Sequence, residues 1–253
     1  VSVDKEGKET DQWVVFSIGG GALAEESDGA SSVNTPDVYS MNSMTEILQW
    51  CERTGKSYWE YVKECEDSDI WDYLQEVWKT MQNAVKRGLE QEGVLPGPLN
   101  LRRKASTYYI RASGYKQSLQ SRGLVFAYAL AVSEENASGG VIVTAPTCGS
   151  CGVMPAVLYH LAKSREFSDT RILRALATAG LVGNIVKTNA SISGAEVGCQ
   201  GEVGVACAMA SAAANQLFGG SPAQIEYAAE MGLEHHLGMT CDPVCGLVQI
   251  PCI

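Results

Sequence analysis

A series of apolar segments with helical spacing is the feature that most constrains the fold of this chain. Ile70, Leu74, Val77, Met81 and Val85 recur three or four residues apart, which places them on one face of a single helix. Similar apolar or amphipathic segments follow at 119–135, 153–164, 171–187, 203–218 and 222–237. Turns containing Gly, Asn or Pro separate them, and many of their residues are Ala or Gly, whose small side chains let backbones approach. The sequence therefore predicts an all-α body.

Extended structure is expected in two places. The run "QWVVFSIGGG" (12–21) is rich in β-formers and ends in three glycines, which is typical of a strand followed by a turn. A single strand is not stable alone, so we expect it to pair with another segment, one that this chain need not contain. The glycines lack the lysine of a phosphate loop and the spacing of a dinucleotide site, and a hinge is the better interpretation. The run "GVIVTAP" (140–146) also looks extended.

Charge and composition exclude several classes of protein. Residues 1–100 hold 8 Lys and Arg against 19 Asp and Glu, whereas residues 101–253 hold 11 against 10. No basic surface suited to nucleic acid is therefore expected. The apolar stretches fall short of the roughly 18–20 residues that a membrane span requires, and the polar start has no apolar signal region. Nine cysteines without secretory features indicate a cytoplasmic protein with metal or redox chemistry rather than disulfides.

Two glycine-rich stretches are candidate functional loops. "TAPTCGSCGVMPAV" (144–157) leads into an apolar helix and offers hydroxyls and backbone N–H groups to a carboxylate or phosphate, although on these residues alone a tight turn with a helix cap is the better interpretation. Its Cys148 and Cys151 form a CxxC pair, which is a possible redox pair or metal half-site. "NASISGAEVGCQGEVG" (189–204) is unusually polar for a stretch between apolar helices. Polar groups buried there need partners, so we interpret it as a loop that reaches into a site.

The closing stretch "MTCDPVCGLVQIPCI" carries Cys241, Cys245 and Cys252. Thiolates held on glycine and proline turns suit an iron–sulfur cluster, but a set of buried thiols is the alternative, and spacing alone leaves both open. His235 and His236 precede this stretch. Neighbouring positions on a helix point about 100° apart, so we expect the pair to be satisfied locally rather than to face one site.

At these same stretches the sequence closely resembles the catalytic α domain of the iron–sulfur-dependent L-serine dehydratases. The matching runs are "EENASGGVIVTAPT", "NASISGAEVGCQGEVGVACAMA" and "GGSPAQIEYAAEMGLEHHLGMTCDPVCGLVQIPCI". The resemblance implies a helical catalytic domain and a [4Fe–4S] cluster held by Cys199, Cys241 and Cys252. It also implies conversion of L-serine to pyruvate and ammonia, with the open iron acting as a Lewis acid on the substrate hydroxyl.

The resemblance also implies substrate contacts from the two loops. The candidates are Thr147, Ser150, Asn189, Ser191, Ser193 and, as a partner of the substrate ammonium, Glu196. Many relatives have Asn or Ala where this chain has Cys148, which puts contacts at that position in doubt. Cys148, Cys151, Cys207 and Cys245 fall at positions that the family does not use as ligands.

The chain departs from the family in two ways. The Ser-Ser-Ser-His-Thr motif that is thought to supply the catalytic base in the family's β domain is absent, and the family's helical domain continues beyond "PCI". We therefore expect residues 1–40 to be a strand, hinge and linker from a β domain, and residues 41–253 to be a helical domain truncated at its C-terminus. The expected partners are L-serine, a β domain or subunit of the same enzyme, and further copies of the chain. Two alternatives are a lyase acting on L-cysteine or another β-substituted amino acid, and an inactive structural fragment.

Overall fold

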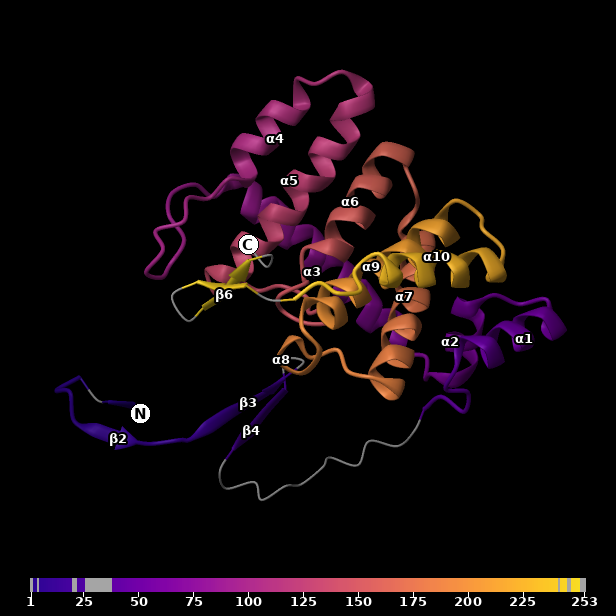
Figure 1. Cartoon of the computed structure of the whole chain (residues 1–253), viewed down its shortest axis with the longest axis horizontal. Helices are drawn as coiled ribbons and strands as arrows, with labels where there is room; N and C mark the ends of the chain where they lie inside the picture. Colours follow the sequence, from indigo (N-terminus) through magenta and orange to yellow (C-terminus); the bar gives the residue numbers. More distant parts are fainter. Residues whose placement is uncertain are drawn as a thin grey trace.

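The computed structural model describes the backbone of residues 2–3, 5–19, 22–25, 38–240, 242–244 and 247–250. Most of these residues are helical, and the helices pack into one body, while the N-terminal hairpins extend away from it (Figure 1). This arrangement confirms the helical fold class predicted from the sequence. The helices are α1 (Met44–Thr54), α2 (Tyr58–Cys65), α3 (Ile70–Glu90), α4 (Ala105–Ser113), α5 (Gln117–Ala137), α6 (Val153–Arg165), α7 (Asp169–Asn189), α8 (Gly194–Val197), α9 (Cys199–Leu217) and α10 (Pro222–Glu234).

Helix boundaries follow the capping residues of the sequence. Ser43 accepts a hydrogen bond from the N–H of Glu46 at the start of α1, and Gly55 ends that helix with a φ of 70°, a left-handed conformation that glycine adopts without strain. Helix α10 begins with a capping box between Ser221 and Gln224, with proline at its first position. The expected helices at 119–135, 153–164, 171–187, 203–218 and 222–237 correspond to α5, α6, α7, α9 and α10.

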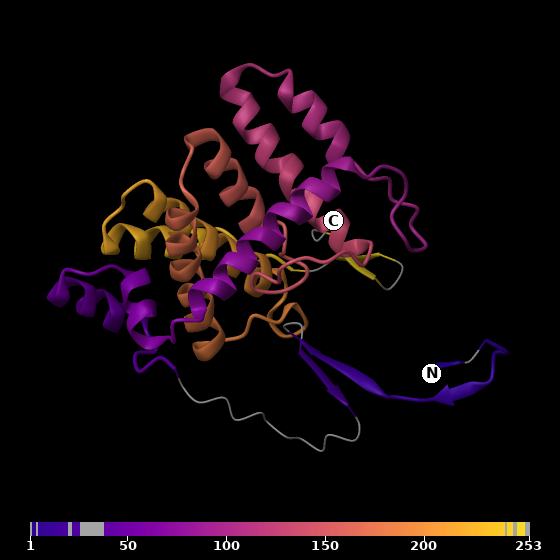
Figure 2. The same ribbon diagram turned by 180° about the vertical axis from the view of Figure 1, so that it is seen from behind.

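Helix α9 occupies the centre of the bundle and packs against α6, α7 and α10. Its buried residues are mostly small, among them Gly204, Ala208 and Ala212, so neighbouring helices come close to its backbone. Helix α3 crosses the other face of the bundle, as Figure 2 shows, and packs against α5 and α7. Its fully buried Trp78 donates a hydrogen bond from Nε1 to Asp169 Oδ1 at 3.1 Å, which ties α3 to the start of α7.

The described strands form three antiparallel hairpins. They are β1 (Ser2–Val3) with β2 (Glu9–Asp11), β3 (Val15–Gly19) with β4 (Ala22–Glu25), and β5 (Asp242–Val244) with β6 (Leu247–Ile250). Strand β3 confirms the strand predicted in "QWVVFSIGGG", but its partner is β4, which follows directly in this chain. The expected hinge glycines 20 and 21 lie outside the described residues.

One local expectation was wrong, and one helix was missed. The run 140–146 forms no strand, and the backbone carbonyl of Val141 accepts a hydrogen bond from Arg87 Nη2 at 2.5 Å instead of pairing with another strand. Helix α4 was not expected, because its tyrosines and serines give it weak apolar periodicity. It packs against α5 as a helical hairpin at one end of the bundle.

The close crossing of α3 and α5 gives the first prediction. A methyl group at Gly88 would lie 2.1 Å from the carbonyl oxygen of Ala131, so Gly88→Ala must push the helices apart. We expect the free energy of unfolding to fall by about 1–3 kcal/mol, measured by denaturant titration. Gly180→Ala in α7 is the control, because a methyl group there meets no atom within 4 Å, and we expect it to be neutral or stabilising by up to about 1 kcal/mol. Equal effects of the two substitutions would contradict the close crossing.

Candidate active site at the first turn of helix α9

The loop that leads into α6 buries its hydroxyl side chains. Thr147 is 4% exposed and Ser150 is 2% exposed, and their hydroxyl oxygens are 3.4 Å apart. Asn136, at the end of α5, donates from Nδ2 to the carbonyl oxygen of Cys148 at 3.2 Å. The loop is thus held from the side of α5, and two of the predicted site residues lie together on its inner face.

Glu202, in the first turn of α9, connects this loop to the next one. Its Oε1 accepts hydrogen bonds from the N–H of Gly149, at 3.1 Å, and from the hydroxyl of Thr147. A methyl group at Gly194 would lie 2.6 Å from Glu202 Oε2, so the second loop passes directly over the other carboxylate oxygen. One carboxylate therefore lies between the two loops that the sequence selected as functional.

The sequence reasoning missed Glu202. Its signal was the spacing to Cys199, three residues earlier, because positions i and i+3 share one side of a helix. Glu196, which was chosen instead, is exposed and accepts a hydrogen bond from the hydroxyl of Ser191.

The predicted residues of the second loop (189–204) differ in burial and in hydrogen-bond partners. Ser193 is 9% exposed and its N–H donates to Ser191 Oγ at 3.1 Å, next to Gly194 and Glu202. Asn189 is exposed, and its amide nitrogen donates to the carbonyl oxygens of Asn42, at 2.6 Å, and of Ile185, at 2.9 Å. The structure therefore brings Thr147 into contact with Glu202, with Ser150 beside Thr147 and Ser193 next to Gly194 in the chain, while the Asn189 side chain bonds to the chain ahead of α1.

Cys199 is fully buried at the first position of α9. Gly198, just before it, has a φ of 72°, which turns the chain sharply from α8 into α9. The N–H of Gln200 donates to the carbonyl oxygen of Met239 at 3.0 Å, so the segment that precedes Cys241 packs beside Cys199.

The other expected ligands, Cys241 and Cys252, lie outside the described residues, as does Cys245. Among the side chains that the structure describes, no three His, Cys, Asp or Glu residues form a metal-binding group.

The other cysteines differ in their surroundings. Cys148 is exposed, whereas Cys151 is buried, with its Sγ 4.0 Å from the carbonyl oxygen of Val132. Cys207, two turns along α9 from Cys199, has its Sγ 3.4 Å from His236 Nε2, and burial raises the pKa of its thiol. A raised pKa favours the neutral thiol, which is a poor nucleophile.

Both histidines bond within their own turn, as expected. Nδ1 of His235 lies 2.7 Å from the Met231 carbonyl oxygen, and Nδ1 of His236 lies 2.7 Å from that of Gly232. A carbonyl can only accept, so each Nδ1 carries the proton and Nε2 of His236 is left as an acceptor for the Cys207 thiol.

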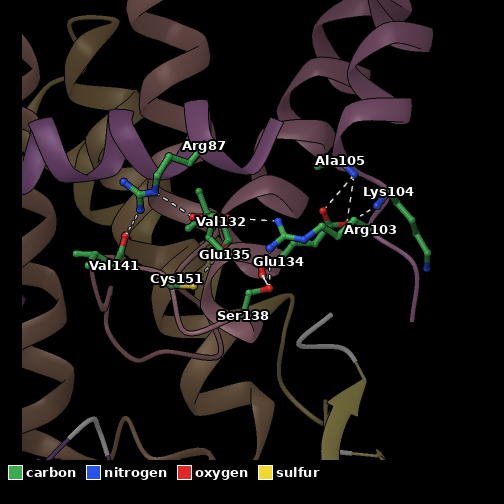
Figure 3. A network of polar contacts seen from close by, with 10 residues as sticks. All are labelled: Arg87, Arg103, Lys104, Ala105, Val132, Glu134, Glu135, Ser138, Val141 and Cys151. Carbon is green, nitrogen blue, oxygen red and sulfur yellow. Dashed lines mark hydrogen bonds and ion pairs between the residues drawn. The ribbon is translucent and has the colours of Figure 1, made fainter. Parts of the chain in front are cut away.

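A charged network supports the site from α5 (Figure 3). Glu135 pairs with Arg87, at 3.0 Å, and with Arg103, at 3.3 Å. Glu134 is 1% exposed and accepts the N–H groups of Lys104, at 2.6 Å, and Ala105, at 3.3 Å. The network caps the start of α4 and fixes the end of α5, from which the 138–152 loop departs.

Two cavities include residues of the 144–152 loop in their lining. One, of about 300 Å³, is bounded by Lys104, Tyr108, Phe126, Ser133, Ser150 and Val203. The other, of about 440 Å³, includes Glu66, Thr144, Pro146, Asn184, Lys187 and Ile192 in its lining. Space for a small molecule is thus available next to this loop.

These features define a helical domain in which glycine-rich loops surround one carboxylate and a buried cysteine at a helix start. Residues 17–253 match the family model described as serine dehydratase alpha chain, and the chain belongs to that family. It is 48% identical over 252 residues to L-serine dehydratase 1 of Escherichia coli (strain K12), covering 94% of this chain and 55% of the relative.

Two further relatives agree. The chain is 45% identical over 262 residues to L-serine dehydratase of Streptomyces coelicolor (strain ATCC BAA-471 / A3(2) / M145), covering 99% of this chain and 57% of the relative. It is 43% identical over 265 residues to L-serine dehydratase of Haemophilus influenzae (strain ATCC 51907 / DSM 11121 / KW20 / Rd), covering 100% of this chain and 58% of the relative. The chain thus spans a little more than half the length of these relatives. Within the described part of the chain, no helix is both long and apolar enough to cross a membrane.

The bridging position of Glu202 predicts a cost for its removal. Glu202→Ala leaves the Thr147 hydroxyl and the Gly149 N–H without their acceptor, and we expect the free energy of unfolding to fall by about 1–3 kcal/mol. The exposed Glu196→Ala is the matched control, expected to change it by less than about 0.5 kcal/mol. Chemical denaturation measures both, and a silent Glu202→Ala would show that the carboxylate does not hold the loops.

The buried Glu134 predicts a pH dependence. Burial raises its pKa above the ordinary value of 4.5, and the N–H donors of Lys104 and Ala105 oppose this only in part. The folded chain then binds the proton more tightly than the unfolded chain, so this residue's contribution to stability decreases as pH rises from near 4.5 through the raised pKa. Glu134→Gln cannot ionise and keeps an acceptor oxygen, so it should lose less stability than the wild type over that window.

Denaturation at a series of pH values tests this dependence on Glu134. The control is Glu230→Gln, which removes one exposed carboxylate and so measures the general effect on stability of losing a negative charge. A difference between the wild type and Glu134→Gln that is constant with pH would contradict the raised pKa.

Proposed function

We propose that this chain forms the catalytic helical part of an L-serine dehydratase, which converts L-serine to pyruvate and ammonia. The observation that carries the proposal is the family match over residues 17–253, together with relatives named L-serine dehydratase at 43–48% identity. The meeting of both candidate loops at Glu202 supports it, because a small polar substrate needs several polar groups that converge on one place.

We further propose a [4Fe–4S] cluster held by Cys199, Cys241 and Cys252. The described residues fit such a group in two respects. Cys199 is buried at a helix start behind a glycine, so a thiolate there is supported by the positive end of the helix dipole. Thr240, the residue before Cys241, lies with its Cα 3.6 Å from where a methyl group on Gly198 would be.

When bound, the cluster would supply Lewis-acid assistance to the departure of the substrate hydroxyl through an iron without a protein ligand. The chain's own residues would bind and orient L-serine. Thr147, Ser150 and Ser193 offer hydroxyl groups around Glu202, whose carboxylate holds the loops and balances the positive charge of the substrate ammonium. The remaining candidates for substrate contact lie in the second loop (189–204) and are Asn189, Ser191 and Glu196.

Elimination of water from L-serine gives aminoacrylate, which takes up water and releases ammonia and pyruvate. The α-proton must go to a base, and the sequence resemblance implies that this base lies in a β domain or subunit. We propose that residues 1–40 belong to the connection with that domain and that residues 41–253 are the catalytic domain, with L-serine, the β domain and further copies of the chain as its partners.

The test is an iron and sulfide count on anaerobically purified and reconstituted chain, with L-serine-dependent pyruvate formation measured on the chain together with its β domain, which is proposed to supply the base. We expect about four irons per chain, lost in Cys199→Ala, Cys241→Ala and Cys252→Ala and retained in the control Cys245→Ala. Iron loss in the control equal to that in the others would contradict the ligand assignment.

The activity assay separates the remaining alternatives. Pyruvate from L-cysteine but not from L-serine would replace the proposed substrate by a sulfur analogue. A chain that binds no iron after reconstitution would contradict the proposed cofactor site, and the inactive structural fragment would then be the better account.

A further inference from the structure

Helices α9 and α10 pack along an unusually close seam. A methyl group at Gly232 of α10 would lie 2.8 Å from the carbonyl oxygen of Cys207, and one at Gly204 of α9 would lie 3.1 Å from His236 Cβ. Only residues without a side chain permit this approach. The seam leads the chain after α10 back along α9 toward Cys199.

Gln200 holds the end of this returning segment at two points. Its backbone N–H donates to the carbonyl oxygen of Met239 at 3.0 Å, and its side-chain Oε1 accepts from the N–H of Gly238 at 2.9 Å. Gly238 has a φ of 86°, so the chain leaves the helical path at this residue. Its backbone N–H is accepted by the side chain of Gln200.

A second contact fixes the same segment two residues earlier, at His236. The Cys207 thiol lies 3.4 Å from His236 Nε2, and the proton on Nδ1 of that ring is directed to Gly232. The segment from His236 to Thr240 is thus attached to α9 at Cys207 and at Gln200. Of these two attachments, that of Gln200 is the nearer to both Cys199 and Cys241 along the chain.

We propose that Gln200 is a positioning residue whose side chain sets the placement of Cys241 relative to Cys199. This inference rests on the proposed cluster, because placement of the two thiols matters most if both bind one group. Gln200 does not contact the substrate in this account; it acts through the backbone of Gly238. Residues that orient metal ligands in this way typically change metal retention by about 10–100-fold when they are removed.

The matched variants are Gln200→Leu, which removes the acceptor, and Gln200→Glu, which keeps an oxygen in reach of the Gly238 N–H. Gln120→Leu is the control, since Gln120 also bonds a backbone group through its side chain, to the Ser113 carbonyl oxygen at 3.1 Å, but far along the chain from Cys199. Gln200→Ala is a second truncation in case the leucine variant does not fold, and far-UV circular dichroism checks folding in each.

The first readout is the rate at which reconstituted, anaerobic chain loses iron to a chelator. We expect Gln200→Leu and Gln200→Ala to lose iron about 10-fold faster than the wild type, and Gln200→Glu and Gln120→Leu to match the wild type. Equal rates in the wild type and both truncations would overturn the inference while leaving the cluster itself in place.

The second readout does not need the cluster. In iron-free chain, hydrogen exchange followed by mass spectrometry reports the peptide that contains Gly238, which we expect to exchange faster in Gln200→Leu and as in the wild type in Gln200→Glu. If the wild type binds no iron, the proposed cofactor site fails. The exchange measurement then tests by itself whether the Gln200 side chain holds the segment around Gly238. Unchanged exchange in Gln200→Leu would overturn the inference in that case as well.

Discussion

The first turn of α9 is the constraint on which the site depends. Gly198 turns the chain into the helix with a φ of 72°, and the residues that follow point in different directions because a helix advances about 100° per residue. Gln200 meets the 238–240 segment, and Glu202 meets the loop of Thr147. Cys199, between the turn and these contacts, is fully buried. One helical turn therefore contacts both the 238–240 segment and the loop of Thr147, which are far apart in the sequence.

The small residues of α9 make that central position possible. Ala and Gly on several faces of the helix allow α6, α7 and α10 to pack on it at once, and close packing restricts how far each neighbour can shift. The charged network of Glu134 and Glu135 fixes the end of α5 independently. The loop from α5 to α6 is thus anchored by charge at its start and by Glu202 near its end.

Much of this architecture was predictable from the sequence, and the reasons for the exceptions are physical. Periodicity identified the long helices, since burial of one face is local information. It missed α4, whose position is set by the carboxylate of Glu134, about 30 residues later in the chain. The partner of β3 was also not identified from the sequence, although β4 follows it directly in the chain.

Within the site, a high density of Ser, Asn and Gly indicated two polar loops, and the folded chain joins them through Glu202, which accepts from Thr147 and lies beside Gly194. Their roles in substrate binding stay predictions. Glu202 was missed because residues 189–204 were expected to form a loop, whereas α9 already begins at Cys199 and so places Cys199 and Glu202 on one side of a helix. Asn189 was a candidate from the family resemblance, and in the fold its amide bonds to Asn42, which only the folded chain brings near. Its role and the ligand roles of Cys199, Cys241 and Cys252 stay predictions.

The central claim is that the cluster and the substrate loops meet at the first turn of α9, so that bound L-serine reaches the iron. Mössbauer spectroscopy of anaerobic chain reconstituted with ⁵⁷Fe, with and without L-serine, tests it most directly. The account predicts that L-serine changes the signal of a single iron and that L-alanine, which lacks the hydroxyl, does not. A cluster whose spectrum is identical with and without saturating L-serine would contradict it.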